Sequence, residues 1–337
     1  MPIVFSEYTQ YPAYLINGNF ESIFPSMFRN IPVPFNRFEL ETPDGDFLEV
    51  DELIANNAKA VILSHGLEGN SRRHYITGLA KCLHASGYDV FAWNCRTCGG
   101  KMNRRLKMYH HAVVDDLDVV VGHARSKGYQ SVYLAGHSMG GNISLNYVLQ
   151  EHNHSEIKGV AAISAPINLF DCVNELSKWN KRFYQNRFLR KLQKKVVEKA
   201  KSFEEVKPKA KMKFANFLDF DTEITAAYHG FKDAFDYYYR ASPAYKLEKL
   251  NVPVLLLNAK NDPFLGRYCY PERFAEQSDL LFLEMPERGG HSGFMIRGRE
   301  ESWADLRTLE FFNQLEKNMT PPINSFSETM IKDISGH

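Results

Sequence analysis

The segment that most constrains this chain is Ser131–Asn142, in which an apolar run ends in Gly136-His137-Ser138-Met139-Gly140. The glycines two positions before and after Ser138 leave room for a tight turn between a strand and a helix. Such a turn raises the serine hydroxyl above a sheet edge, and the following helix directs its N-terminus at the serine, which favours negative charge there. The segment predicts a nucleophilic serine, although five residues alone also recur by chance in glycine-rich turns.

Short apolar runs alternate with segments of helical periodicity along most of the chain. The runs that predict buried strands are 58–64, 88–93, 131–137, 159–167, 252–259 and 280–285. Helical spacing of apolar residues follows several of these runs, and this alternation predicts a mostly parallel central sheet with helices on both faces. Residues 35–41 and 47–53 flank the turn signal Pro43-Asp44-Gly45, which predicts an antiparallel hairpin at an edge of the sheet.

The alternation stops between residues 168 and 250, where a long helical, aromatic and basic segment stands in place of a short connection. We therefore expect a core formed by residues 35–167 and 251–318, with a helical cap inserted at 168–250. An N-terminal arm is expected at 1–34, with a short helix near 22–28, and a tail on the surface at 319–337.

A nucleophilic serine needs a base, and the base needs an orienting group. Asp262 follows one predicted strand and His291 follows the next, so both lie at the carboxyl ends of strands, where open α/β sheets bind ligands. Taken alone, Asp262 is equally well explained as a turn residue and His291 as a loop residue. Their order after Ser138, at three strand ends, favours a Ser-Asp-His triad, in which Asp262 orients His291 and His291 takes the serine proton.

The tetrahedral intermediate also needs donors for its oxyanion. The backbone N–H groups of Met139 and Leu67 are predicted to supply them. His65 and His137 lie beside the tight turns, so we expect supporting or packing roles for them rather than the role of base. The supporting glycines are Gly66, Gly136 and Gly140.

Composition excludes several classes of function. Forty-one basic and 40 acidic residues nearly cancel, which argues against a nucleic-acid partner. The odd number of cysteines, an N-terminus without a signal sequence and the lack of a long apolar run predict a cytoplasmic protein. Cys95 and Cys98 have C-x-x-C spacing but no second ligand pair, and the histidine pairs at 110–111 and 152/154 are expected on a solvated surface. No metal or cofactor is expected.

The inserted segment contains a basic amphipathic helix. Phe188, Leu192 and Val196 recur at helical spacing among many lysines and arginines. One reading is a cap helix that packs its apolar side on the core and leaves its charges in solvent. The alternative is that the basic face attracts anionic lipid or acyl-CoA-like substrates, which would give peripheral membrane contact. Residues 237–239, all tyrosine, are expected either to line an acyl pocket or to belong to the core.

With these features assembled, the chain resembles the YheT-like branch of the α/β-hydrolases, which includes eukaryotic fatty-acid ethyl ester synthase/esterases and related lipid hydrolases. The motifs that carry the resemblance, besides the Ser138 segment, lie at 42–46, 65–69, 109–110, 164–166, 220–231 and 236–238. The resemblance implies the α/β-hydrolase fold and places the triad on Ser138, Asp262 and His291. The family's Arg-Gly-Cys becomes Arg96-Thr97-Cys98, and its Asn-Pro-His-x-Gln-Thr becomes the sequence at 17–22. We expect neither departure to touch the triad, although either could reshape the pocket mouth.

These observations predict a serine hydrolase that cleaves small to medium apolar acyl esters through an acyl-enzyme. Its partner is then a small-molecule ester, and the sequence leaves the oligomeric state open. Within enzymes, the alternatives are a lipase or phospholipase that acts at membranes, and an acyltransferase in which an alcohol replaces water. From another class comes a non-catalytic binding protein that keeps the hydrolase scaffold.

Overall fold

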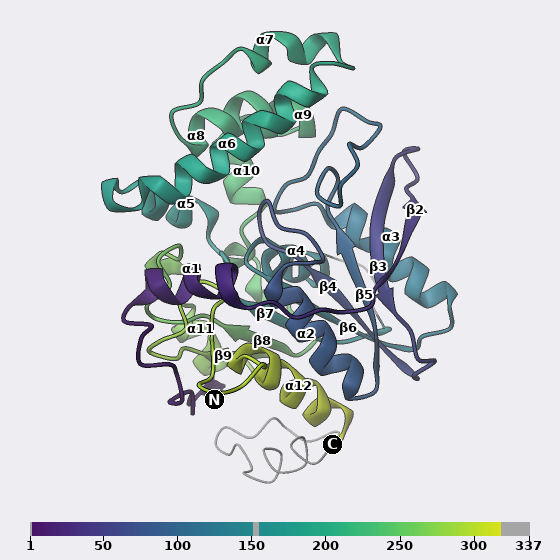
Figure 1. Ribbon diagram of the computed structural model, residues 1–337, viewed down its shortest axis with the longest axis vertical. Helices are drawn as coiled ribbons and strands as arrows, with labels where there is room; N and C mark the ends of the chain where they lie inside the picture. The colour runs from purple at the N-terminus through teal and green to yellow at the C-terminus, as the bar shows by residue number, and fades with distance from the viewer. Residues whose placement is uncertain (1, 151–154, 318–337) are drawn as a thin grey trace.

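The computed structural model describes residues 2–150 and 155–317 and contains a nine-stranded sheet (Figure 1). The strand order is β1-β9-β8-β7-β6-β4-β5-β3-β2, and all neighbours are parallel except β3 with β5 and β2 with β3. The strands are β1 (Ile3–Val4), β2 (Asn36–Glu41), β3 (Phe47–Leu53), β4 (Lys59–Ser64), β5 (Tyr88–Asn94), β6 (Ser131–His137), β7 (Ile157–Ile163), β8 (Val254–Leu257) and β9 (Leu281–Glu284). The predicted mostly parallel sheet is confirmed.

The sheet is buried on both faces, which explains why its strands read as continuous apolar runs. In β4, Ala60 and Ile62 pack into one hydrophobic core, whereas Val61 and Leu63 pack into a second core on the opposite face. Helices α3 (Val114–Ser126), α4 (Met139–Val148) and α11 (Glu272–Gln277) contribute to the first core. Helices α2 (His74–Ala85) and α12 (Trp303–Glu316) contribute to the second.

One edge of the sheet agrees with the sequence prediction and the other does not. The hairpin of β2 and β3 lies at one edge, as predicted. The other edge is β1, which pairs in parallel with β9 and which we did not predict, because two residues show no periodicity. The strand predicted at 159–167 begins at Ile157 and ends at Ile163.

A helical region is inserted between β7 and β8, and Figure 1 shows it above one end of the sheet. Its helices are α5 (Leu169–Ser177), α6 (Arg182–Lys199), α7 (Lys207–Ala210), α8 (Phe217–Phe220), α9 (Ala227–His229) and α10 (Ala234–Arg240). A π-helical segment, η3 (Asp221–Ala226), joins α8 to α9. The short 3₁₀ turns of this region are η1 (Trp179–Lys181), η2 (Glu204–Val206), η4 (Pro243–Tyr245) and η5 (Leu247–Lys249), and a further 3₁₀ turn, η6 (Arg267–Cys269), follows β8.

The basic helix α6 does not leave all its charges in solvent, so that expectation is wrong in part. Its apolar residues Leu192 and Val196 are buried, as expected. Lysines spaced four residues apart also turn toward the core, where Lys195 Nζ lies 2.7 Å from Glu68 Oε1 and Lys199 Nζ donates to the carbonyl of Asn103 at 2.9 Å. The helix is therefore held to the core by charge as well as by apolar packing.

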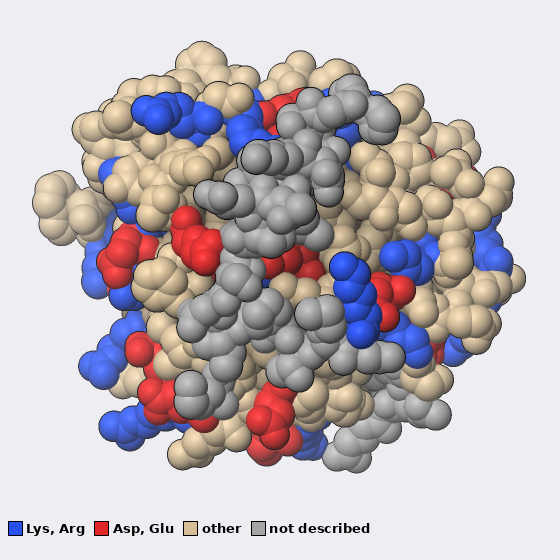
Figure 2. Space-filling model, turned by 90° about the horizontal axis from the view of Figure 1, so that it is seen from below, with Lys and Arg blue, Asp and Glu red and all other residues tan. Residues whose placement is uncertain are grey.

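The face opposite the inserted helices carries basic and acidic side chains interspersed with uncharged ones (Figure 2). The tail predicted at 319–337 and the histidines at 152 and 154 lie outside the described residues.

Candidate active site

Ser138 occupies the tight turn between β6 and α4. Its backbone is strained, with φ 55° and ψ −121°, and its N–H donates to the carbonyl of Ile163 at 2.8 Å. A Cβ at Gly136 would lie 2.3 Å from the carbonyl carbon of Gly140, and a Cβ at Gly140 would lie 2.0 Å from the Ser64 oxygen. Only glycine fits either position, so the turn that raises Ser138 depends on both.

Asp262 and His291 lie together at neighbouring strand ends. Asp262 Oδ2 lies 2.8 Å from His291 Nδ1, and Asp262 Oδ1 accepts the N–H of Phe264 at 2.8 Å. The Phe264 ring stacks on the imidazole with centroids 4.1 Å apart. The Asp262 side chain is fully buried, and these contacts assign the Nδ1 proton of His291 to the hydrogen bond with the carboxylate. Among the residues that the structure describes, His291 Nε2 has no hydrogen-bond partner.

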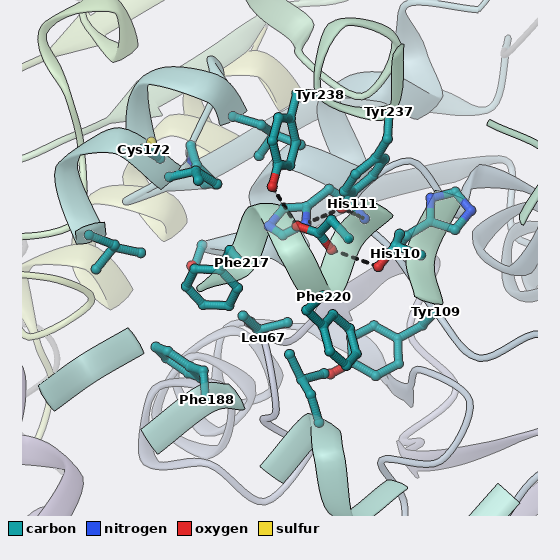
Figure 3. Close-up of a pocket in the computed structure, with 18 of the residues that line it drawn as sticks. Leu67, Tyr109, His110, His111, Cys172, Phe188, Phe217, Phe220, Tyr237 and Tyr238 are labelled. Carbon is teal, nitrogen blue, oxygen red and sulfur yellow. Dashed lines mark hydrogen bonds between the residues drawn. The ribbon is translucent and has the colours of Figure 1, made fainter. Parts of the chain in front are cut away.

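Ser138 and His291 line the same cavity, which lies between the sheet and the inserted helices (Figure 3). Every α-helix of the insertion except α7 contributes to its walls. Much of the lining is apolar and includes Leu67 from the core and Phe188 and Phe217 from the insertion. Of the tyrosines at 237–239, the first two line the cavity, whereas Tyr239 is exposed and stacks on Tyr245.

The loop at residues 65–69 passes close to Ser138. A Cβ added at Gly66 would lie 3.2 Å from the Ser138 Cβ. Within the described residues, the Leu67 N–H has no hydrogen-bond acceptor, and Met139 is the first residue of α4, so its N–H has no acceptor within the helix. Neither of the two N–H groups predicted to bind the oxyanion is engaged in a backbone hydrogen bond among the described residues.

His65 and His137 lie outside both cavities that reach Ser138. His65 Nδ1 donates to the Gly66 carbonyl at 2.8 Å and its Nε2 accepts the N–H of Cys95 at 3.1 Å, which ties the loop to the end of β5. Burial lowers the pKa of His65 to about 4 and that of His137 well below its usual value. Both rings are neutral packing groups, whereas His291 lines both cavities that reach Ser138.

Comparison with known proteins places these features in a family. The profile of the family Hydrolase_4, described as serine aminopeptidase S33, matches residues 55–275. The chain belongs to this family of α/β-hydrolases. It is 29% identical to "Putative esterase YheT" of Escherichia coli K12, over 83% of this chain and 84% of that protein. It is also 29% identical to mouse phospholipase ABHD3, over 78% of this chain and 67% of the relative.

A third relative is medium-chain fatty acid ethyl ester synthase/esterase 2 of Saccharomyces cerevisiae, with 24% identity over 80% of this chain and 65% of that protein. Among solved structures, the esterase Pf2001 of Pyrococcus furiosus matches with a TM-score of 0.56 and 17% identity, covering 83% of this chain and 92% of that one. Est1E of Butyrivibrio proteoclasticus with bound ferulic acid matches with a TM-score of 0.55 and 17% identity, covering 83% and 99%. The structural matches show the α/β-hydrolase fold, and the sequence matches place the chain in the branch that contains YheT, ABHD3 and the yeast ethyl ester synthase/esterase.

In this α/β-hydrolase the N-terminal helix α1 (Gly18–Phe28) supports the loop that carries His291, which corrects our expectation that the 17–22 segment does not touch the predicted triad. The His291 N–H donates to Ser22 Oγ at 2.7 Å. Glu21 is buried and its Oε2 accepts the Gly289 N–H and the Asn261 amide, each at 2.7 Å. One helix thus fixes the loops of both Asp262 and His291.

One part of the cavity lining in this hydrolase is polar, contrary to our expectation. His110 and His111 line it rather than a solvated surface, and His111 Nδ1 lies 2.8 Å from the Tyr237 hydroxyl. The Tyr238 hydroxyl donates to Asp221 at 2.8 Å, and burial raises the pKa of that carboxyl to about 6. The polar group is visible in Figure 3 opposite Phe188.

Among the residues that the structure describes, no cluster of histidine, cysteine and carboxylate side chains could hold a metal ion. Cys95 and Cys98 are free thiols. No helix in the described ranges is long and apolar enough to cross a membrane.

Proposed function

We propose that this chain is a serine carboxylic-ester hydrolase that acts on small to medium apolar acyl esters through an acyl-enzyme. The observation that carries the proposal is the cavity that Ser138 and His291 both line. The serine there lies in a strained turn, and Asp262 holds the Nδ1 side of the histidine. Enzymes that activate a serine use this relation of nucleophile, base and orienting acid.

In the first half of the reaction, Ser138 Oγ attacks the ester carbonyl carbon and its proton passes to His291 Nε2. Asp262 stabilises the imidazolium, and the N–H groups of Leu67 and Met139 stabilise the oxyanion. Collapse of the tetrahedral intermediate breaks the ester C–O bond, and the alcohol leaves with the proton from His291.

In the second half, water attacks the acyl-serine while His291 takes its proton. The second tetrahedral intermediate releases the carboxylic acid, and the proton returns to Ser138 Oγ. No metal or organic cofactor takes part in either half. The apolar part of the cavity lining provides the site for the acyl chain, because burying its methylene groups drives binding.

A fluorophosphonate probe tests the proposal directly, since it modifies only activated serines. Labelling of the wild type that disappears in Ser138→Ala, together with hydrolysis of p-nitrophenyl esters of increasing acyl length, is the expected result. Labelling that persists in Ser138→Ala would place the nucleophile elsewhere. A folded wild type that neither reacts with the probe nor hydrolyses any ester would favour a binding protein on a hydrolase scaffold.

A further inference from the structure

Ser138 stands between two cavities of different character. The first is the acyl cavity described above. The second, here called the basic cleft, opens on the other side of the serine toward α1, the start of α2 and one face of α6. Ser138 and His291 line both cavities. A substrate bound to Ser138 can therefore place one part in each.

The basic cleft takes its name from Arg73, Arg187 and Lys191, which line it. Within the part of the chain that the structure describes, none of these cations forms an ion pair with a carboxylate. Arg73 Nη2 and Lys191 Nζ reach only the backbone carbonyl of Glu68, each at 3.4 Å. Three cationic side chains thus line one opening, and none of them is in ion-pair contact with a described carboxylate.

The single acidic residue that lines the basic cleft does not neutralise these cations. The Glu68 carboxylate accepts the Tyr109 hydroxyl and lies 2.7 Å from Lys195 Nζ, so its charge is already paired. By contrast, the buried Arg96 is matched by carboxylates, since it contacts Asp44 and Asp116. The cleft beside Ser138 therefore carries an excess of positive charge.

The cations also act on one another. The pKa of Lys191 is lowered, first by burial and then by the charge of Arg73; the charge of Glu68 opposes this shift in part, and the charge of Arg187 adds to it. Like charges held close together destabilise the unliganded protein, and a bound anion relieves that repulsion.

We propose that the basic cleft binds a phosphate group carried by the alcohol portion of the ester. This inference rests on the proposed function, in which the acyl chain fills the apolar cavity and the carbonyl carbon lies at Ser138 Oγ. The alcohol portion then extends into the basic cleft, which is lined by two guanidinium groups and one ammonium group. Guanidinium forks match the spacing of phosphate oxygens and form charge-assisted hydrogen bonds with them. The favoured substrate is therefore an acyl ester of a phosphorylated alcohol.

A matched substrate pair tests this inference. Octanoylglycerol and octanoylglycerol 3-phosphate share the acyl chain and the bond that breaks, and water converts each to octanoate and the free alcohol. We expect the wild type to have a kcat/KM for the phosphate ester about tenfold or more above that for the neutral ester. In Arg187→Gln/Lys191→Gln, the ratio of the two kcat/KM values falls about tenfold.

The chain offers a matched control on the same helix. Arg190 is exposed on α6 and lines neither cavity, so Arg190→Gln removes a charge from α6 without entering the basic cleft. Its substrate ratio should equal that of the wild type. An equal fall in both variants would show a general effect of net charge and would overturn the inference.

Two further arms separate the remaining outcomes. Glycerol 3-phosphate should inhibit hydrolysis of p-nitrophenyl butyrate competitively, whereas glycerol should not, and equal inhibition by both would overturn the phosphate site.

A dispersed eight-carbon phosphate ester is then compared with a sixteen-carbon one in phosphatidylcholine vesicles, which distinguishes a soluble phosphate ester from a lipid headgroup as the source. If the enzyme hydrolyses octanoylglycerol and p-nitrophenyl butyrate but shows no preference for the phosphate ester, this inference alone is overturned. If it hydrolyses no ester at all, the proposed function is overturned as well.

Discussion

Ser22 and His291 are 269 positions apart in sequence, yet the backbone N–H of His291 donates to Ser22 Oγ at 2.7 Å. The hydrogen bond joins the N-terminal helix to the loop that presents the imidazole to Ser138. Glu21, the preceding residue, accepts the N–H of Gly289 in the same loop. The position of the proposed general base is therefore set partly by a segment that lies outside the strand and helix repeat.

Ser22→Ala should lower kcat for p-nitrophenyl butyrate about five- to tenfold and leave KM nearly unchanged, because losing one hydrogen bond costs about 1 kcal/mol and the loop then samples other positions. Ser22→Thr keeps the hydroxyl and should restore kcat. Met27→Ala, an exposed change on the same helix, is the control and should behave as wild type. A Ser22→Ala enzyme with normal kcat would show that the hydrogen bond does not position the imidazole.

The sequence was sufficient to predict the sheet, the turn around Ser138 and the strand-end positions of Asp262 and His291. Each of these depends on local pattern, because apolar runs mark buried strands and parallel strands present their carboxyl ends at one edge. The contacts of Glu21 and Ser22 could not be read in this way, since hydrogen bonds between distant segments leave no periodic signal. The replacement of the family's Gln-Thr by Glu21-Ser22, which keeps an oxygen acceptor at each position, was the only hint.

The orientation of α6 was also beyond the sequence. The lysines at 191, 195 and 199 recur every four residues, which indicates one shared face. Whether that face meets solvent or the core depends on acceptors on the core, such as the Glu68 carboxylate and the Asn103 carbonyl. His110 and His111 were misplaced for the same reason, because the wall that buries them comes from the insertion.

Gly66→Val should reduce kcat about 10²–10³-fold, since the added side chain displaces either Ser138 or the loop that offers the Leu67 N–H, and one lost oxyanion donor has an effect of this size. Leu67→Met leaves the backbone donor in place and should retain most of the turnover. The comparison uses p-nitrophenyl butyrate kinetics, with far-ultraviolet circular dichroism to show that both variants fold. Near-normal turnover of a folded Gly66→Val enzyme would exclude this loop as the oxyanion donor.

Lys195→Met should lower the free energy of unfolding by about 3–5 kcal/mol, because it leaves the buried Glu68 carboxylate without its cation. Adding Glu68→Gln removes the uncompensated charge and should recover part of the loss. Lys194→Met, on the exposed side of α6, is the control. Urea unfolding measures all four proteins, and equal stability of the two single lysine variants would show that the buried ion pair does not hold α6 to the core.

Thr97→Gly should stabilise the protein by about 1 kcal/mol. Thr97 has φ 71°, which costs a β-branched residue roughly 1–3 kcal/mol, and its hydroxyl is buried without a partner among the described residues. The greater freedom of glycine in the unfolded chain offsets about 0.5–1 kcal/mol of this gain. Thr97→Ala separates the two causes, because it removes the hydroxyl but keeps the Cβ. If urea unfolding finds the alanine variant as stable as the glycine variant, the strained backbone is not the source of the gain.

Asp221 should make stability depend on pH. Its pKa is raised from 3.8 to about 6, chiefly because burial disfavours the charged form, while hydrogen bonds from Thr225 and Tyr238 partly oppose the shift. The folded state therefore binds the proton more tightly than the unfolded state, so the contribution of this group to stability is complete below about pH 4 and is lost as the pH rises through about 6.

Asp221→Asn removes this titration. The free energy of unfolding of the wild type minus that of the variant should fall between about pH 4 and pH 7 and stay constant above that range. Asp219→Asn, an exposed neighbour on α8, removes a charge without changing a buried group and serves as the control. Urea unfolding at half-unit pH intervals measures the difference, and a curve for Asp221→Asn that runs parallel to the wild type would show that this carboxyl does not titrate in the cavity.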